Sequence, residues 1–208
     1  MVSSDSGRID PKTRRQLPEG IRFRKDRGKY QVRMWSIGIN GQKREGTAYT
    51  ETLAEEVGVP TVGWLREEAA ALGCVITGSL IVRDAGQYFN RLVWARPDGS
   101  LEYYDKRHLF RMANEQQHYA AGTRRLVTEI KGWRVCPLIC YDLRFPVWSR
   151  CRGDYDLLLY VANWPQRRAP AWAALLKARA IENLSYVVGV NRIGRDGNVE
   201  DCSFRGVY

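Results

Sequence analysis

The chain has 208 residues, of which 44% are hydrophobic and 27% charged, a composition typical of one globular domain or of one domain with a small module. This composition excludes wholesale disorder, and no run of residues approaches the 18 apolar residues that a membrane span needs. The net charge is +10, and residues 1–50 hold 12 Lys and Arg residues but only 5 Asp and Glu residues. A polyanionic partner such as nucleic acid would account for this basic segment, and so would a solvated arm.

Neither the amino-terminal sequence nor the cysteines indicate export. The sequence MVSSDSGRIDPKTRRQ lacks the apolar stretch of a secretory signal. Five cysteines without the spacing of a disulfide framework predict reduced thiols and a cytoplasmic location. No Cys-x-x-Cys motif occurs and the two histidines are isolated, so a zinc site is not expected.

The first part of the chain predicts a small basic module. Residues 1–16 are polar and are expected to be disordered. Residues 17–57 are expected to hold three short strands in IRFRK, KYQVRMWSIGI and QKREGTAY, with Asn40-Gly41 as a hairpin turn. Thr50 followed by ETLAEEV predicts a short helix.

Residues 58–208 have the pattern of a layered α/β protein. The expected elements are a helix over 61–72 ended by Gly73, buried strands over CVITGSLIV, WRVCPLIC, YDLLLYVAN and SYVVGVN, strands over YFNRLVWA and LEYYDK, and a helix from Pro170 with Trp172, Leu175, Leu176, Arg179 and Asn183 along one stripe. The sequence contains no internal repeat.

Cys140 is the first candidate for chemistry, because it follows an apolar strand and precedes a polar turn. A cysteine at such a turn is exposed, and the next backbone N–H groups can stabilise an oxyanion. Lys106, at the end of LEYYDK, could favour a thiolate, and Glu115 could orient that lysine. Taken locally, the favoured explanations of these residues are a buried structural cysteine, a solvated lysine and a surface carboxylate.

The motifs taken together resemble the nitrilase superfamily of carbon–nitrogen hydrolases. They are VITGSL, YFNRLVW, YYDKRHLF, ICYDLRFPVWSR, YDLLLYVANWP and ARAIENLSYVVGVNRIGRDGN, in the order and approximate spacing of that family. The resemblance implies an α-β-β-α sandwich over residues 58–208, incomplete at both ends. DKRHLFRMA and the segment from Trp164 to Asn183 resemble in particular the omega-amidases, which hydrolyse the terminal amide of 2-oxo acid amides.

This resemblance implies a role for each candidate residue. Cys140 would be the nucleophile that forms a thioester, Lys106 would stabilise the oxyanion, and Glu115 would position the lysine and the substrate. The resemblance also implies substrate-binding roles for Tyr141, Arg144 and Trp164. No metal or organic cofactor is expected, the substrate is expected to be a small amide, and a homodimer is left open.

The sequence departs from the family where the general base is expected. Leu17-Pro18-Glu19 matches the family's LPE motif, but the preceding apolar strand is replaced by PKTRRQ. Residues 17–56 instead resemble, over a short stretch, the arm-binding domain of phage-type integrases. That resemblance implies phosphate contacts by Arg22, Arg24, Lys29, Arg33, Lys43 and Arg44, although a basic sheet edge that deters aggregation would share this composition. The alternative function is therefore a DNA-binding module fused to an inactive nitrilase-like remnant.

Overall fold

A computed structural model describes the backbone of residues 21–24, 29–37, 43–50, 55–56, 60–192 and 206–207, and the side chains of residues 61–192. The strands are β1 (Ile21–Arg24), β2 (Lys29–Ile37), β3 (Lys43–Thr50), β4 (Glu55–Glu56), β5 (Ile76–Asp84), β6 (Gln87–Ala95), β7 (Leu101–Asp105), β8 (Thr128–Ile130), β9 (Trp133–Ile139), β10 (Leu157–Ala162), β11 (Tyr186–Asn191) and β12 (Gly206–Val207). The α-helices are α1 (Pro60–Leu72), α2 (Pro146–Ser149) and α3 (Ala169–Asn183).

The amino-terminal strands agree with the sequence prediction. β1, β2 and β3 form an antiparallel sheet in that order, which confirms three strands in the basic segment. Asn40-Gly41, Glu19 and residues 1–16 lie outside the described residues, as do the side chains of the six basic residues expected to contact phosphate.

The prediction of a short helix after Thr50 is wrong at residues 55 and 56. Glu55 and Glu56 form β4, which pairs in parallel with Val82 and Arg83 of β5. A two-residue segment beside an open strand edge gains backbone hydrogen bonds, and this outweighs a weak local preference for helix.

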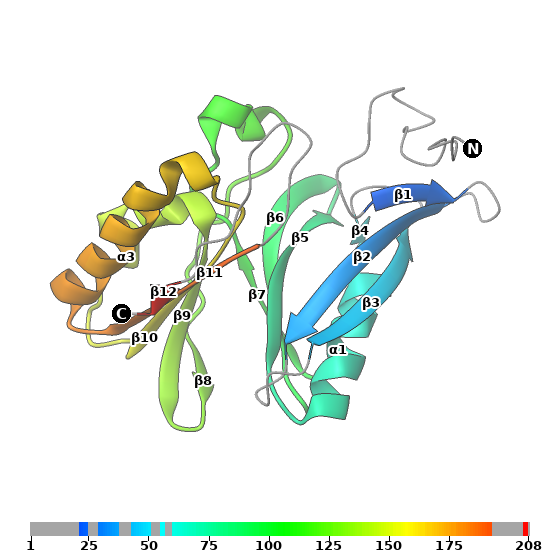
Figure 1. Cartoon of the computed structure of the whole chain (residues 1–208), viewed down its shortest axis with the longest axis horizontal. Coiled ribbons are helices and arrows are strands. Elements are labelled where there is room, and N and C mark those ends of the chain that lie inside the picture. The colour runs from blue at the N-terminus through cyan, green and yellow to red at the C-terminus, as the bar shows by residue number, and fades with distance from the viewer. Residues whose placement is uncertain are drawn as a thin grey trace.

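The four-stranded sheet has the order β4-β5-β6-β7, with α1 on its outer face (Figure 1). Val62, Leu65 and Ala69 of α1 pack on Ile76 of β5 and Val93 of β6. The prediction of a buried β5 is wrong, because only its positions 76 and 82 are buried and residue 81 is 36% exposed. An antiparallel strand covered on one face buries only alternate side chains.

The five-stranded sheet has the order β12-β11-β10-β9-β8, and β9, β10 and β11 run parallel. Helix α3 connects β10 to β11 and covers the outer face of this sheet (Figure 1). The predicted stripe of α3 is confirmed at Trp172, Leu176, Arg179 and Asn183, which are all buried. Gly189 of β11 is required there, because a Cβ atom would lie 2.5 Å from Leu176.

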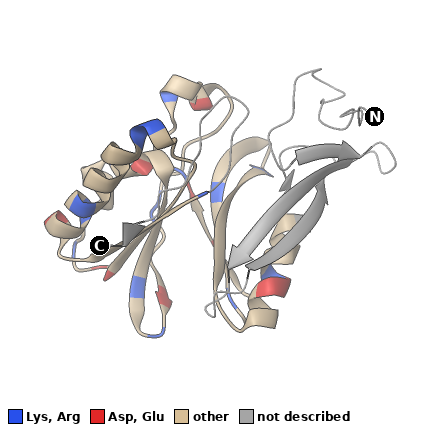
Figure 2. Ribbon diagram, in the orientation of Figure 1, with Lys and Arg blue, Asp and Glu red and all other residues tan. Residues whose placement is uncertain are grey.

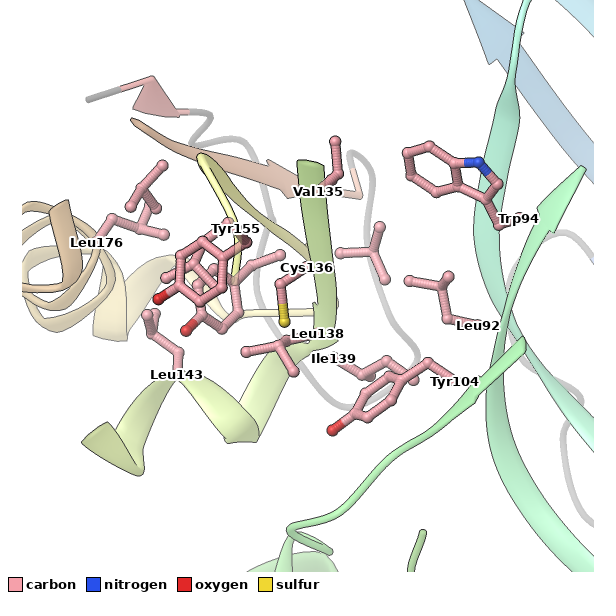
Figure 3. Packing of buried hydrophobic residues seen from close by; sticks show 14 of the residues in the cluster. Leu92, Trp94, Tyr104, Val135, Cys136, Leu138, Ile139, Leu143, Tyr155 and Leu176 are labelled. Atoms are coloured by element: carbon pink, nitrogen blue, oxygen red, sulfur yellow. The ribbon is translucent and has the colours of Figure 1, made fainter. Parts of the chain in front are cut away.

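The main core lies between the two larger sheets and continues to α3. Side chains of β9 alternate: Val135 and Ile139 face Leu92 and Trp94 of β6, whereas Cys136 points toward α3 (Figure 3). Complete burial of a Leu side chain contributes roughly 1.5–3 kcal/mol, so this core fixes the two sheets face to face. The layers are therefore helix, sheet, sheet and helix, as in the predicted sandwich (Figure 1).

Charge is mixed on the outer layers. Both α1 and α3 contain basic and acidic residues (Figure 2). Among the described residues, no helix is both long and apolar enough to cross a membrane.

Candidate active site

Cys140 occupies a sharp turn at the carboxyl end of β9. Its φ of +44° lies in the left-handed region, which a residue with a Cβ adopts at a cost of roughly 1–3 kcal/mol. A five-residue 3₁₀ turn, η3 (Cys140–Arg144), begins there and leads into α2. The backbone N–H of Ile139 donates to Asp142 Oδ2 at 3.1 Å and closes the turn. Cys140 therefore lies just beyond the carboxyl end of β9, with intermediate exposure.

Lys106 and Glu115 form an ion pair in the segment that follows β7. Lys106 Nζ donates to both carboxylate oxygens of Glu115, at 3.0 and 2.7 Å. Glu115 Oε2 also accepts the backbone N–H of Phe110 at 2.7 Å. Lys106 is only 2% exposed and Glu115 is 19% exposed, so the pair is held rigidly. The role expected for Glu115, to orient Lys106, is consistent with this geometry.

The segment carrying Lys106 is fixed from both sides. The N–H of Lys106 donates to Asn90 O, and its carbonyl accepts the N–H of Gly122, each at 2.9 Å. A Cβ atom on Gly122 would lie 2.0 Å from the carbonyl oxygen of Asp105. This position therefore needs glycine, since any side chain would displace the strand end that carries Lys106.

Opposing effects set the pKa of the Cys140 thiol. Burial raises the pKa, because it disfavours the thiolate, and the positive charge of Lys106 lowers it. Burial prevails, and the pKa lies above the usual value. Lys106 therefore favours the thiolate, as expected, but it does not offset burial, and a base is needed to remove the thiol proton at neutral pH.

Asp142 is a buried carboxylate that the sequence reasoning did not select. It is fully buried and contacts Tyr104, His108 and Ile139. The only signal for it in the sequence was its place between Tyr141 and Arg144, which were both selected.

Arg144 and Trp164 lie together, and Tyr141 lies in an aromatic group. The guanidinium carbon of Arg144 is 5.2 Å from the centre of the Trp164 ring, a cation–π contact. Trp164 is only 4% exposed, so it supports Arg144 from inside the protein. The Tyr141 ring makes edge contacts with the rings of Phe110 and Phe145, with centroids 5.0 and 5.2 Å apart.

The loop after β10 lies against Cys140. Cys140 Sγ is 3.8 Å from the carbonyl oxygen of Asn163. The next residue, Trp164, is held by two backbone hydrogen bonds to the buried side chain of Asn191, at 2.7 and 2.8 Å. Asn191, at the end of β11, therefore fixes the loop that contacts the cysteine. The ends of β9, β10 and β11 all contribute to this site.

A surface cavity of about 470 Å³ lies elsewhere, at the opposite ends of these strands. Its lining includes Trp133, Cys151, Tyr155 and Tyr186, and none of the candidate catalytic residues. Within residues 61–192, no group of three His, Cys, Asp or Glu side chains is placed to hold a metal ion.

Comparison with known proteins gives consistent results. A family model described as carbon–nitrogen hydrolase matches residues 34–206. The omega-amidase YafV of Escherichia coli K12 is 53% identical over 145 residues, covering 70% of this chain and 56% of that protein. The 2-oxoglutaramate amidase of Bacillus subtilis is 33% identical over 171 residues, covering 80% of this chain and 64% of that protein. The chain thus spans about half to two thirds of the length of these relatives.

Solved structures show the same fold. A CN-hydrolase superfamily protein of Xanthomonas campestris, described with an arsenic adduct in its active site, is 55% identical with a TM-score of 0.70, covering 74% of this chain and 62% of that one. Nit3 of Saccharomyces cerevisiae, a member of the nitrilase superfamily, has a TM-score of 0.65 at 21% identity, covering 74% of this chain and 59% of that one.

Proposed function

Because this chain belongs to the carbon–nitrogen hydrolase family, we propose that it cleaves the amide bond of a small substrate with Cys140 as the nucleophile. The observation that carries the proposal is the buried Lys106 ammonium, which Glu115 holds in an ion pair and whose positive charge acts on the Cys140 thiol. A buried ammonium beside a nucleophile can stabilise the negative charge that develops on a carbonyl oxygen during attack.

The reaction has two halves. The sulfur of Cys140 attacks the amide carbon, and the carbonyl oxygen becomes an oxyanion stabilised by Lys106 and by the backbone N–H of Tyr141. Collapse breaks the carbon–nitrogen bond, and the nitrogen leaves as ammonia with the proton taken from the thiol. Water then attacks the thioester, and the acid and the free thiol are released.

The proton transfers need a base other than Glu115 and Asp142, the two carboxylates near Cys140 in the described part of the chain. Glu115 already accepts three hydrogen bonds, and Asp142 is fully engaged with its own donors. Glu19 of the LPE motif is the sequence candidate for this base. A missing base lowers the rate by roughly 10²–10⁴-fold, so Glu19→Gln tests its contribution.

We propose a 2-oxo acid omega-amide, such as 2-oxoglutaramate, as the substrate. Support comes from Arg144, which is exposed and makes no ion pair within residues 61–192 although it lies four residues after Cys140. A cation in this position can bind the carboxylate of such a substrate. The two amidases at 53% and 33% identity support the same class.

The test is ammonia release from 2-oxoglutaramate by the full chain. The proposal predicts ammonia release that Cys140→Ala abolishes, with a raised KM in Arg144→Gln. Release unchanged by Cys140→Ala, or no release even at protein concentrations near that of the substrate, would overturn it.

A second proposal concerns DNA contact by residues 21–50. Its support is the register of the β1–β2 pair, which places Arg24 directly opposite Lys29. Two basic residues on paired strands can bind one phosphate together. Binding to duplex DNA should weaken with salt, with a log–log slope of about −0.9 for each phosphate contacted. Retained binding in Arg24→Gln/Lys29→Gln would remove the proposal.

A further inference from the structure

Asp142 is a buried carboxylate surrounded by hydrogen-bond donors from separate parts of the chain. Oδ1 accepts the backbone N–H of His108 at 2.9 Å and lies 2.8 Å from His108 Nδ1. Oδ2 accepts the Tyr104 hydroxyl at 2.7 Å and the N–H of Ile139 at 3.1 Å. A carboxylate can only accept, so His108 carries its proton on Nδ1. No Lys or Arg within residues 61–192 forms an ion pair with Asp142.

These donors bracket the two residues that carry the proposed chemistry. Tyr104 and His108 lie two residues before and two residues after Lys106. Ile139 immediately precedes Cys140, and Asp142 itself follows Cys140 by two residues. One carboxylate therefore joins the end of β7 to the turn at the end of β9.

A second layer of contacts extends this connection. The Tyr104 hydroxyl accepts the backbone N–H of Arg107 at 3.2 Å and the indole N–H of Trp148 at 3.0 Å. The His108 ring stacks on Phe145 with centroids 3.7 Å apart. The residue after Lys106 and the helix after the cysteine turn are thus held by the same group.

We propose that Asp142 is a positioning residue that holds the Lys106 ammonium beside the Cys140 sulfur. A buried carboxylate without a Lys or Arg partner is stable only while its donors stay in place, since an unsatisfied buried charge is costly. The donors come from segments about 35 residues apart in sequence, so these segments cannot shift independently. The inference rests on the proposed roles of Cys140 and Lys106, but it does not depend on any particular amide.

The test is a double-mutant cycle that measures alkylation of Cys140 and needs no turnover. The four proteins are the native chain, Lys106→Met, Asp142→Asn and the double variant. Iodoacetamide labelling is followed by peptide mapping between pH 7 and pH 10. Asp142→Asn keeps the side-chain volume but places an amide N–H₂ against donors that need an acceptor.

When Asp142 is native, we expect Lys106→Met to slow the labelling of Cys140 about 10-fold, because the thiolate loses a neighbouring cation. In the Asp142→Asn background the same substitution should change the rate less than about 2-fold, because Lys106 is no longer held beside the sulfur. A purely structural role for Asp142 would leave the effect of Lys106→Met unchanged.

The matched control is Glu102→Gln. Glu102 also accepts hydrogen bonds within this fold, from Arg96 and Thr128, but it lies near the opposite end of β7. Its cycle with Lys106→Met should be additive. If Asp142→Asn does not unfold cooperatively, Tyr104→Phe takes its place in the cycle. This variant removes one of the hydrogen-bond donors to Asp142, and we expect a smaller coupling with Lys106→Met.

Additive effects in both the Asp142 and the Tyr104 cycles would overturn the positioning role. No effect of Lys106→Met in the native chain would overturn the roles of both Lys106 and Asp142. Coupling in a chain that releases no ammonia would support the positioning role and refute the proposed hydrolysis, so the two failures are distinguishable.

Discussion

The middle and the carboxyl end of β9 show how position along one strand determines what a cysteine can do. Cys136, in the middle of the strand, is fully buried, and burial raises the pKa of its thiol to about 12. Cys140, four residues later, has intermediate exposure, a left-handed backbone and Lys106 in its electrostatic environment. The same side chain is a core residue at one position and a candidate nucleophile at the other.

The comparison extends to the ends of the five-stranded sheet. The carboxyl ends of β9, β10 and β11 carry Cys140, Asn163 and Asn191, whereas the amino ends border the open cavity with Trp133 and Tyr186. In open α/β sheets, ligand sites form outside the carboxyl ends of the strands. The cavity is therefore not the place where we expect amide chemistry.

The largest expected difference is in labelling of the two cysteines. Iodoacetamide should modify Cys140 at least about 10³-fold faster than Cys136, which reacts only when the core opens. The Cys140 rate should rise with pH through a midpoint above its usual value, because its pKa is raised. Peptide mapping against time gives both rates, and equal rates would show that β9 does not pack as described.

Lys106→Met should lower kcat for amide hydrolysis by about 10²–10³-fold, as expected for loss of one oxyanion donor. KM should change little, because the charge develops in the transition state. Steady-state ammonia release measures both constants. A change confined to KM would assign Lys106 to substrate binding.

Glu115→Gln should have a smaller effect, about 10–100-fold on kcat, because the amide oxygen still accepts one hydrogen bond from Lys106. The control is again Glu102→Gln, which weakens an ion pair with Arg96 and should leave kcat unchanged. Equal effects of the two variants would indicate a general loss of stability.

Cys136→Ala should lower the free energy of unfolding by about 1 kcal/mol at neutral pH, because it leaves a small cavity. It should leave turnover unchanged. The native thiol has a raised pKa, so its neutral form contributes stability below about pH 9 that is lost as the pH rises toward 12. The stability difference between variant and native chain should therefore narrow over this window in urea titrations.

The smallest expected effect is at the amino end of the sheet. Tyr186→Ser removes an exposed ring that contacts Trp133 at 5.3 Å. Neither kcat nor KM should change by more than about 2-fold, since the substitution is far from the strand ends that carry the site. A large change in KM would move substrate binding to the cavity.

Hydrophobic runs and turn residues in the sequence predicted most of the elements from β5 to β11 and both long helices. The sequence did not predict the short strand β8 (Thr128–Ile130) or the pairing of β4 with β5. A strand of two or three residues carries too little pattern, and its formation depends on an edge supplied by distant residues.

The motifs predicted three residues of the candidate site but not the buried carboxylate of Asp142. Cys140, Lys106 and Glu115 were identified by their places in the motifs, and the described geometry pairs the last two. Asp142 was missed because its surroundings are set by four hydrogen-bond contacts that only the folded chain brings together. The sequence indicated the effect of Lys106 on the Cys140 thiol but not the net rise of its pKa, because burial is a property of packing and cannot be obtained from neighbouring residue types.

The most direct test of the central claim is the mass of the covalent intermediate. The full chain is mixed with 2-oxoglutaramate, quenched in acid, digested and analysed by mass spectrometry. The account predicts the substrate acyl group, without its amide nitrogen, on the peptide that contains Cys140, and no such adduct in Cys140→Ala. An acyl adduct on another cysteine, or ammonia release by Cys140→Ala at the native rate, would contradict it.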